Sequence, residues 1–458
     1  MPKKPKTQEI ARAFLASTIM FDGHLLDAKV DILFHADEQI FYHYDQASGA
    51  WVIIPVGDRD TGPLAKMLSS FLETNFPDVD ANSSAIKELR AAIVRIMDNV
   101  VGEETHELTR YTAFQDGLLD WQTFELVPHD KTKLAFHSFP FSYPHETQVI
   151  HTPVFDAYLA RAFKDDAAMQ AFIPEMIGYY MLPKTKEPAA FYLYGQARSG
   201  KSVMLDLMRE LIGDRFTCSF SLQSLTSDKY TVAELAGKRV NIQDEDESEF
   251  ILSDKFKALI SQSRIQAERK YGTPFSFCPH CKLLFGSNQL PMFKSVDDGL
   301  MRRLRFIEYK HPLLPEEQDK EILDKLIREL SGIVQRSIKA ARAFMDRGQE
   351  FNLSESSIHT AEQFAIESEP ALAFMEECYQ IYPDAASDAV PSEGWTPYSD
   401  IYKHYQTWCK ENGKYPKSSS KFVKVLDRIP KLKIGRSSDI RFRSCVRRGS
   451  QTYPKPTF

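Results

Sequence analysis

The spacing of hydrophobic residues changes along the chain and predicts a mixed first part followed by an α/β centre. In the first 150 residues, helical spacing is found at 8–16, 64–72 and 85–99, and strand-like runs at 39–44 and 51–55. From residue 151 onwards, short buried runs alternate with helical stretches, and these runs lie at 189–194, 240–243, 282–286 and 304–307. Alternating strands and helices are typical of an α/β fold.

The remaining sequence predicts helices, a linker and a small C-terminal domain. Residues 315–344 form one or two long helices whose apolar stripe indicates packing, and residues 381–397, rich in Pro, Ala, Ser and Asp, indicate a linker. Helices at 400–409 and 418–426 and a strand pair around 432–434 and 440–442 follow. We therefore expect four parts: an N-terminal domain at 1–150, a core at 151–345, a helical segment and linker at 346–395, and a C-terminal domain at 396–458.

One octet carries the clearest chemical signal. Between a strand-like run and a helix-like stretch at 203–212, the chain matches the G-x-x-x-x-G-K-[ST] phosphate-binding loop with Gly195-Gln196-Ala197-Arg198-Ser199-Gly200-Lys201-Ser202. In such a loop, backbone N–H groups surround the phosphates and the helix N-terminus adds positive charge. We expect all eight residues to bind ATP, Lys201 to reach its β- and γ-phosphates, and Ser202 to ligate Mg²⁺.

Polar residues at two later strand ends suit the same site. The run 240–243 ends at an acidic cluster, in which we expect Asp244 to hold Mg²⁺ and its water shell and Glu245 to polarise the attacking water. The next run ends close to Asn288, which we expect to orient the water and sense the γ-phosphate. An acidic loop and an Asn that merely ends a strand are the structural alternatives.

Two basic clusters follow the acidic one. Residues 264–277 alternate around a Tyr-Gly-Thr-Pro turn and predict a β-hairpin. Its side chains could contact a DNA backbone and stack on a base, and the candidates are Arg264, Arg269, Lys270 and Tyr271. Arg302 and Arg303 precede the last strand-like run, where a guanidinium could reach the γ-phosphate of a neighbouring subunit. Solvated surface charge is the alternative for both clusters.

Charge and cysteine content narrow the class of protein. The net charge of −6 conceals a basic tail, because residues 403–458 carry 15 Lys and Arg against three acidic residues, a net +12, which leaves −18 on residues 1–402. A basic end of this kind is typical of a nucleic-acid-binding module. No apolar run predicts a membrane span or secretory signal, so we expect a cytoplasmic protein. Six scattered cysteines do not suggest a disulfide scaffold, and Cys278-Pro279-His280-Cys281 lacks a second pair for zinc.

This order of motifs resembles the superfamily 3 helicases, specifically the phage/plasmid and poxvirus primase-helicase branch. Further segments carry the resemblance over most of the chain: 41–44 with 49–51, 114–120 with 125–129, 286–291 and 301–305. Ser199 departs from the Asn usual before Gly-Lys-Ser, and Gln262-Ser263 from the usual Gly-Asp. Many relatives carry a primase-polymerase domain before these elements, for which too few residues are present here, so we expect a helicase without its own primase.

The resemblance implies an AAA+-like P-loop ATPase core, a mixed α+β N-terminal domain and a C-terminal winged helix. It further implies that the chain is an ATP-dependent replicative helicase that acts on single-stranded and forked DNA. The expected assembly is a homohexameric ring that hydrolyses ATP with Mg²⁺, in which Arg302 or Arg303 acts in trans. A separate primase or polymerase is the expected partner. Two alternatives stay open: an ATP-switched initiator or loader that binds DNA without processive unwinding, and an RNA-directed enzyme of the same superfamily.

Overall fold

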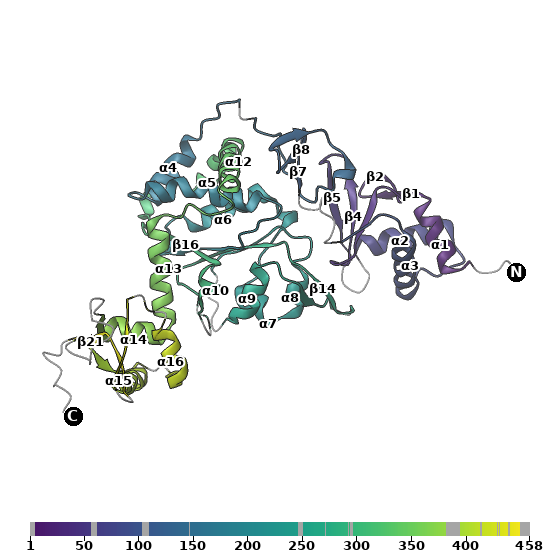
Figure 1. Ribbon diagram of the computed structural model, residues 1–458. Helices are drawn as coiled ribbons and strands as arrows, with labels where there is room; N and C mark the ends of the chain where they lie inside the picture. The colour runs from purple at the N-terminus through teal and green to yellow at the C-terminus, as the bar shows by residue number, and fades with distance from the viewer. Residues whose placement is uncertain are drawn as a thin grey trace. The chain divides into compact units, whose positions relative to one another are not determined.

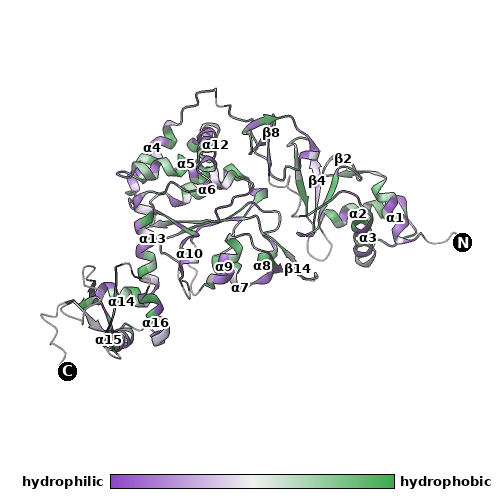
Figure 2. Ribbon diagram, in the orientation of Figure 1, coloured by the Kyte–Doolittle hydropathy of each residue, from purple (hydrophilic) through white to green (hydrophobic). Residues whose placement is uncertain are grey.

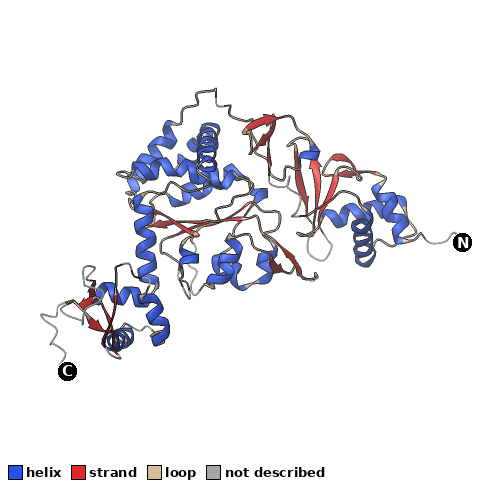
Figure 3. Ribbon diagram, in the orientation of Figure 1, coloured by secondary structure: helices blue, strands red, loops and turns tan. Residues whose placement is uncertain are grey.

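The chain has a mixed α/β fold that divides into two compact units. The computed structural model describes residues 5–55, 62–102, 110–145, 147–245, 251–270, 272–291, 293, 296–381, 394–412, 415–427, 429, 431–437 and 440–448. The first unit comprises Met1–Pro291 and Arg302–Ile358, and the second comprises Met292–Met301 and His359–Phe458. Figures 1 and 3 show helices and strands in both units.

The first unit begins with helices packed on a four-stranded sheet of order β5-β4-β3-β6. Its helices are α1 (Thr7–Leu15), α2 (Pro63–Asn75) and α3 (Ser83–Ile96), and its strands are β3 (Ile32–His35), β4 (Ile40–Asp45), β5 (Ala50–Ile54) and β6 (Val100–Val101). Pro63 opens α2, and Asn82 caps α3 by accepting a hydrogen bond from the Ala85 N–H. The three expected helices and the two expected strands, β4 and β5, are therefore present, whereas β3 and β6 were not expected.

Several further strands of this part were also not expected from the sequence. They are a hairpin of β1 (Thr18–Phe21) and β2 (His24–Asp27), and a sheet of β7 (Tyr111–Phe114), β8 (Gly117–Asp120) and β9 (Glu125–Val127). A 3₁₀ turn at Lys131–Lys133 follows. The segment after this turn contains the buried His137. Its Nε2 donates a hydrogen bond to the carbonyl of Ile212, 3.0 Å away, which is the last residue of α6 (Lys201–Ile212). His137 thus satisfies one of the carbonyls that every helix leaves unpaired at its C-terminus.

A parallel five-stranded sheet forms the centre of the first unit, in the order β11-β12-β15-β10-β16. The strands are β10 (Ala190–Gly195), β11 (Thr217–Cys218), β12 (Val240–Gln243), β15 (Lys282–Ser287) and β16 (Leu304–Tyr309). In Figure 1, one face is covered by α5 (Ala167–Met181), α6 (Lys201–Ile212) and α12 (Leu330–Asp346), and the other by α7 (Leu222–Ser227), α8 (Lys229–Ala233) and α9 (Ser253–Ile260). Because both faces are covered, the strands are continuous hydrophobic runs.

Other helices complete this unit. α4 (Pro153–Ala162) precedes α5, α11 (Ile322–Arg328) precedes α12, and short 3₁₀ turns lie at Asp214–Phe216 and Pro315–Glu317. The expected apolar stripe of 315–344 is divided between α11 and α12, with Leu326, Val334 and Ile338 buried. Figure 2 shows both hydrophobic and hydrophilic residues on α9 and α12, as expected for amphipathic helices.

Two cations, the buried Lys282 and the half-buried Arg239, fix the C-terminal end of α5. Lys282 Nζ donates to the carbonyls of Tyr179 and Leu182, and Arg239 donates to those of Leu182 and Pro183. Burial lowers the pKa of Lys282 well below its usual value and the pKa of Arg239 to about 10. The negative end of the α5 dipole therefore faces positive charge, which ties this helix to the sheet.

The second unit contains the helices and strand pair expected near the C-terminus. They are α15 (Tyr398–Glu411), α16 (Ser419–Leu426), β19 (Ile434–Ser437) and β20 (Ile440–Arg443). The unit also has α10 (Asp298–Met301), α14 (Pro370–Cys378), β17 (Tyr379–Ile381) paired with β21 (Cys445–Arg447), and β18 (Thr396–Pro397), which joins β20 and β19 in one sheet. α13 (Glu355–Ser368) belongs to both units.

The core of the second unit includes a helix that precedes the expected linker. Phe374 of α14 packs against Tyr405 and Trp408 of α15, and the Tyr405 ring stacks on Phe422 of α16 with centroids 4.3 Å apart. Most of the linker expected at 381–397 lies outside the described residues. In the part of the chain that the structure covers, no helix has the length and apolar content that crossing a membrane requires.

The buried His137 predicts a specific loss of stability in acid. Burial lowers its pKa from 6.5 to about 3, so between these pH values the unfolded chain binds the extra proton and stability falls as the pH falls. At about pH 4.5 this amounts to roughly 2–3 kcal/mol. Gln at this position keeps an N–H donor but does not titrate. We expect the urea midpoint of His137→Gln to change less between pH 7 and about pH 4.5 than that of the wild type; equal changes would contradict the assignment.

Candidate functional site

The carboxyl ends of three adjacent strands bring the candidate residues together. In the parallel register, Tyr194 of β10 pairs with Ser287 of β15, and Gln243 of β12 pairs with Phe285 of β15. The loop 195–202, Asn288 and Asp244 therefore leave the sheet at the same edge. Ligands of open α/β sheets bind at this edge.

Lys201 contacts most of the candidate residues at this end of the sheet. Its ammonium donates to the carbonyls of Gly195 and Gln196 at 2.7 and 2.8 Å and to Asn288 Oδ1 at 3.2 Å, and lies 3.4 Å from the Ser199 hydroxyl. The side chain is only 6% exposed, and burial lowers its pKa while the Asp244 carboxylate opposes that shift. The predicted phosphate-loop lysine and the predicted strand-end Asn are thus in direct contact.

The loop itself has the tight geometry that phosphate binding requires. Gly200 adopts φ +101° at the N-cap of α6, and Arg198 adopts φ +64°. A Cβ on Gly195 would lie 2.2 Å from the Tyr309 carbonyl, so only glycine fits there. Ser199, which stands where the helicase branch that the sequence resembles usually has Asn, is buried and donates to the Gln196 carbonyl at 2.8 Å. The exchange therefore preserves a closed loop.

Two tyrosines that sequence reasoning did not single out support the loop from behind. The Tyr158 hydroxyl of α4 donates to the Gly200 carbonyl at 2.9 Å and lies 3.1 Å from the Tyr309 hydroxyl at the end of β16. Both rings are buried, and burial raises both pKa values. No sequence signal could reveal Tyr158, because 42 residues separate it from Gly200.

Asp244 and Glu245 lie where the acidic strand end was expected. Asp244 Oδ1 accepts a hydrogen bond from the Glu245 N–H at 2.9 Å. Glu245 is exposed and has φ +53°, a conformation that costs energy for a non-glycine residue and is often found at functional sites. Asp246 and Glu247 lie outside the described residues.

Gly286 makes room for Asp244. β15 separates β12 from β10, and a Cβ at Gly286 would lie 2.7 Å from Asp244 Oδ1 and 2.5 Å from Leu205 Cδ1. The glycine lets the carboxylate lie across β15, on the side of the Lys201 ammonium that it stabilises. A glycine inside a strand pattern is the sequence signal that could have identified this position.

These residues fit a nucleotide and Mg²⁺. Ser202 is exposed in the first turn of α6, whose N-terminus offers N–H groups and positive charge to phosphates. Mg²⁺ in nucleotide sites takes one or two protein oxygen ligands and otherwise phosphate and water oxygens, which Ser202 and Asp244 could supply. Among the described residues, no three His, Cys, Asp or Glu side chains form a separate metal cluster, and this includes the region of Cys278 and Cys281.

Arg302 and Arg303 lie at the other edge of the sheet. Leu304, the first residue of β16, pairs with Ala190, the first residue of β10, so the arginines precede the amino ends of both strands. A six-residue strand spans about 20 Å, which separates them from the loop of the same chain. Arg303 Nε donates to Ser261 Oγ at 2.8 Å, and Arg302 is exposed.

The expected hairpin is present as β13 (Ile265–Ala267) paired with β14 (Phe275–Phe277). Its two arginines contact the turn between β3 and β4: Arg264 pairs with Asp37 at 3.0 Å, and Arg269 Nη2 donates to the Glu38 carbonyl at 2.9 Å. Lys270 is exposed, and Tyr271 lies outside the described residues. Among the candidate DNA contacts that the structure describes, Arg264 and Lys270 are exposed, and Arg264 is already paired with Asp37.

Two family models match parts of the chain. The model "D5 N terminal like" matches residues 58–178, and the model "Family of unknown function (DUF5906)" matches residues 193–303. A protein of Acanthamoeba polyphaga mimivirus, "Putative helicase L207/L206", is 26% identical over 178 residues, which are 36% of this chain and 18% of that protein. The match thus spans less than a fifth of the viral relative.

Solved structures share the fold. "The A form apo structure of NrS-1 C terminal region-CTR" has a TM-score of 0.50 at 12% identity and covers 97% of this chain and 99% of its own. "The apo structure of NrS-1 C terminal region (305-718)" has a TM-score of 0.50 at 11% identity, with 97% and 100% covered. Together, these matches show a shared fold over nearly the whole chain and partial sequence similarity to a putative viral helicase. The assignment to superfamily 3 stays a prediction.

Proposed function

We propose that this chain is an ATP-dependent replicative DNA helicase of a phage, plasmid or virus. The observation that carries the proposal is the bonding of Lys201 to both the phosphate loop and Asn288, at the sheet edge where Asp244 also lies. The helicase description of the mimivirus relative and the D5-type family model support the same class.

In this proposal, the candidate residues at the carboxyl ends of β10, β12 and β15 each have a role in ATP hydrolysis. The loop N–H groups and Lys201 bind and neutralise the phosphates, Asn288 orients the attacking water, and Glu245 accepts its proton. Ser202 and Asp244 would hold Mg²⁺, which would neutralise charge on the phosphate oxygens. The exposure of Glu245 beside the half-buried Asp244 supports this division of roles.

A ring of subunits accounts for the arginine pair. Arg302 and Arg303 are too far from their own phosphate loop to contact the γ-phosphate, so they would act on the site of a neighbouring copy. The ring is homo-oligomeric in this proposal, and a hexamer is its expected form.

DNA contacts would come from the hairpin and the second unit. Lys270 is exposed near the hairpin tip, and Lys421 and Lys424 are exposed on α16, beside the strand pair of the winged-helix arrangement that we propose for this unit. Strand displacement on a fork would separate a helicase from an ATP-switched initiator or loader. Competition between DNA and RNA single strands would separate it from an RNA-directed enzyme.

The first test separates binding from hydrolysis. Lys201→Ala should lower ATP turnover at least about 100-fold, because it removes the charge that faces the phosphates. Glu245→Gln should bind ATP normally and lose about 10²- to 10⁴-fold in turnover, because the amide cannot accept a proton. The matched control is Glu210→Gln on the exposed face of α6. Steady-state hydrolysis and nucleotide affinity decide, and normal turnover in Glu245→Gln would move the base role away from this residue.

A second test uses two buried tyrosines with similar bonds. The Tyr158 hydroxyl donates to a phosphate-loop carbonyl, and the Tyr180 hydroxyl donates to the Leu283 carbonyl at the start of β15. Replacing either by Phe should cost roughly 1–3 kcal/mol of stability, because a buried carbonyl loses its donor. Only Tyr158→Phe should also raise the KM for ATP, by about 2- to 12-fold. Equal KM values in the two variants would show that the loop does not depend on Tyr158.

A third test asks whether sites are shared between subunits. Arg302→Ala/Arg303→Ala protein mixed with Lys201→Ala protein should regain ATPase activity, because an intact loop can then meet an intact arginine pair. Lys201→Ala mixed with Glu245→Gln provides the control, since both lesions lie in cis and no site becomes complete. Activity is measured against the mixing ratio. The absence of recovery at every ratio would refute action in trans.

A further inference from the structure

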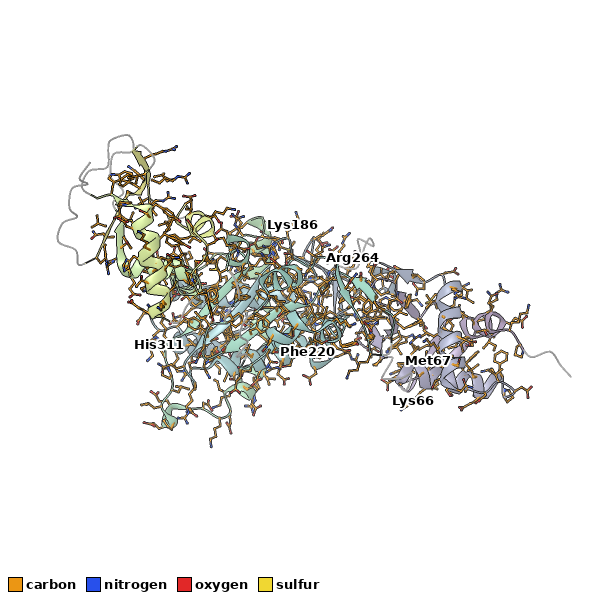
Figure 4. The ribbon with its side chains drawn as sticks, turned by 90° about the horizontal axis from the view of Figure 1, so that it is seen from below. Lys66, Met67, Lys186, Phe220, Arg264 and His311 are labelled. Carbon is orange, nitrogen blue, oxygen red and sulfur yellow. The ribbon has the colours of Figure 1, made fainter. Side chains whose placement is uncertain are left out.

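The first unit contains a large cleft between its N-terminal helices and the hairpin side of the sheet. This N-terminal cleft has a volume of about 1640 Å³ and is lined by α2 and α3 on one side and by α8 and the β13–β14 hairpin on the other. Figure 4 labels Lys66 and Met67 of the first side and Phe220 of the second. Small-molecule pockets measure about 300–1,000 Å³, so the size favours an extended segment of a polymer.

The α3 side presents a basic stripe. Lys87, Arg90, Ala91, Val94 and Arg95 line the cleft, and their spacing places them on one helical face, while Ile86, Leu89 and Ile93 are buried on the other. Lys87 and Arg90 are three residues apart, so these two cations are neighbours on that face of the helix. In the described part of the chain, none of Lys66, Lys87 and Arg95 forms an ion pair.

The opposite side is also basic. It contributes Arg215, Lys238, Arg269 and Lys270, whereas the acidic residues that line the cleft are Asp22, Asp228 and Glu234. Burial lowers the pKa of Arg269, the carboxylates of Glu234 and Glu38 oppose that shift, and the charge of Arg90 adds to it. The guanidinium groups of the two sides are therefore within electrostatic range of each other. Positive charges that face one another across a cleft favour a polyanion between them.

An exposed aromatic ring lies among these cations. Tyr230 of α8 lines the cleft and is 36% exposed, with the Lys229 ammonium 5.2 Å from its ring centroid. Phe220 and Phe275 are half-buried on the same side. Cations combined with an accessible ring are typical of surfaces that bind single-stranded nucleic acid, where phosphates contact the cations and bases stack on the ring.

We propose that the N-terminal cleft binds a single strand of nucleic acid, with its phosphates on the α3 stripe and a base on Tyr230. The nature of this ligand rests on the proposed function. Lys270 and Gly272 near the hairpin tip also line the cleft, so a strand held at the tip continues directly into it. An acidic polypeptide would satisfy the charges but has no base to stack on Tyr230.

The test compares two pairs of charge reversals in the full chain. Lys87→Glu/Arg95→Glu alters the cleft, and Lys164→Glu/Lys339→Glu alters exposed positions that do not line it. Both pairs make the net charge of −6 more negative by four units, so the overall electrostatic effect is matched. Fluorescence anisotropy of a labelled oligothymidylate is titrated with salt, and thermal unfolding verifies that each variant is folded.

We expect the Lys87→Glu/Arg95→Glu variant to bind the oligothymidylate more weakly. The slope of log affinity against log salt should become shallower by about 1.4, which is about 0.7 for each lost phosphate contact. The Lys164→Glu/Lys339→Glu pair should keep the wild-type slope. Tyr230→Ala should weaken binding about 5- to 150-fold, whereas Tyr230→Phe should retain it, because the ring face remains. Rescue by Phe separates stacking from a merely structural role of Tyr230.

The outcomes distinguish this inference from the proposed function. A wild-type protein that binds no single strand would refute both. Normal wild-type binding with an unchanged salt slope in the cleft pair would refute the cleft assignment and leave the helicase proposal intact. Polyglutamate that competes as well as unlabelled oligothymidylate would also overturn the inference, in favour of an acidic polypeptide.

Discussion

The parallel pairing of β10 with β15 and β16 is the constraint on which the candidate site depends. It places the end of β10, which leads into the phosphate loop, beside the end of β15, which leads into Asn288. It also brings Tyr309 of β16 beside Gly195, the first residue of the loop. The same pairing sends Arg302 and Arg303 to the amino edge. One sheet thereby presents the proposed phosphate-binding groups at the carboxyl ends of its strands and the arginines at the amino ends. In the proposed ring, this arrangement would let one copy of the chain offer its arginines to the site of the next.

Burial on both faces of the sheet makes this placement rigid, and polar groups inside the core reinforce it. Lys282 and Arg239 attach the end of α5 to the sheet through three carbonyls, although each cation loses its hydration there. The Tyr180 hydroxyl adds a bond from α5 to the Leu283 carbonyl. If α5 slid along β15, the charged groups of Lys282 and Arg239 would lose these carbonyl acceptors inside the protein. That loss would be costly, so the helix has one favourable position.

The sequence predicted the features that are encoded locally. The phosphate-loop motif, the hairpin and many of the helices were identifiable because their residues are neighbours in the chain, and Asn288 was expected near the loop from its position after a strand. What escaped prediction depends on contacts between distant segments: Tyr158 beneath Gly200, the contact of Arg264 with Asp37, the packing of α14 in the second unit, and the cleft between α3 and the hairpin. Periodicity identifies a helix face but not its partner, so the basic stripe of α3 had no meaning until the hairpin was seen opposite it.

The bonding of Lys201 has a kinetic consequence for the proposed enzyme. Its ammonium has three N–H donors and four oxygen neighbours within 3.4 Å, so the protein alone satisfies it. When a phosphate leaves, the buried Lys201 ammonium therefore keeps hydrogen-bond partners, because the carbonyls of Gly195 and Gln196 accept from it instead. Product dissociation often limits turnover in enzymes that close around their ligands. A lysine that returns to its own loop lowers this barrier, and it makes the residence time of ADP a property of the loop backbone.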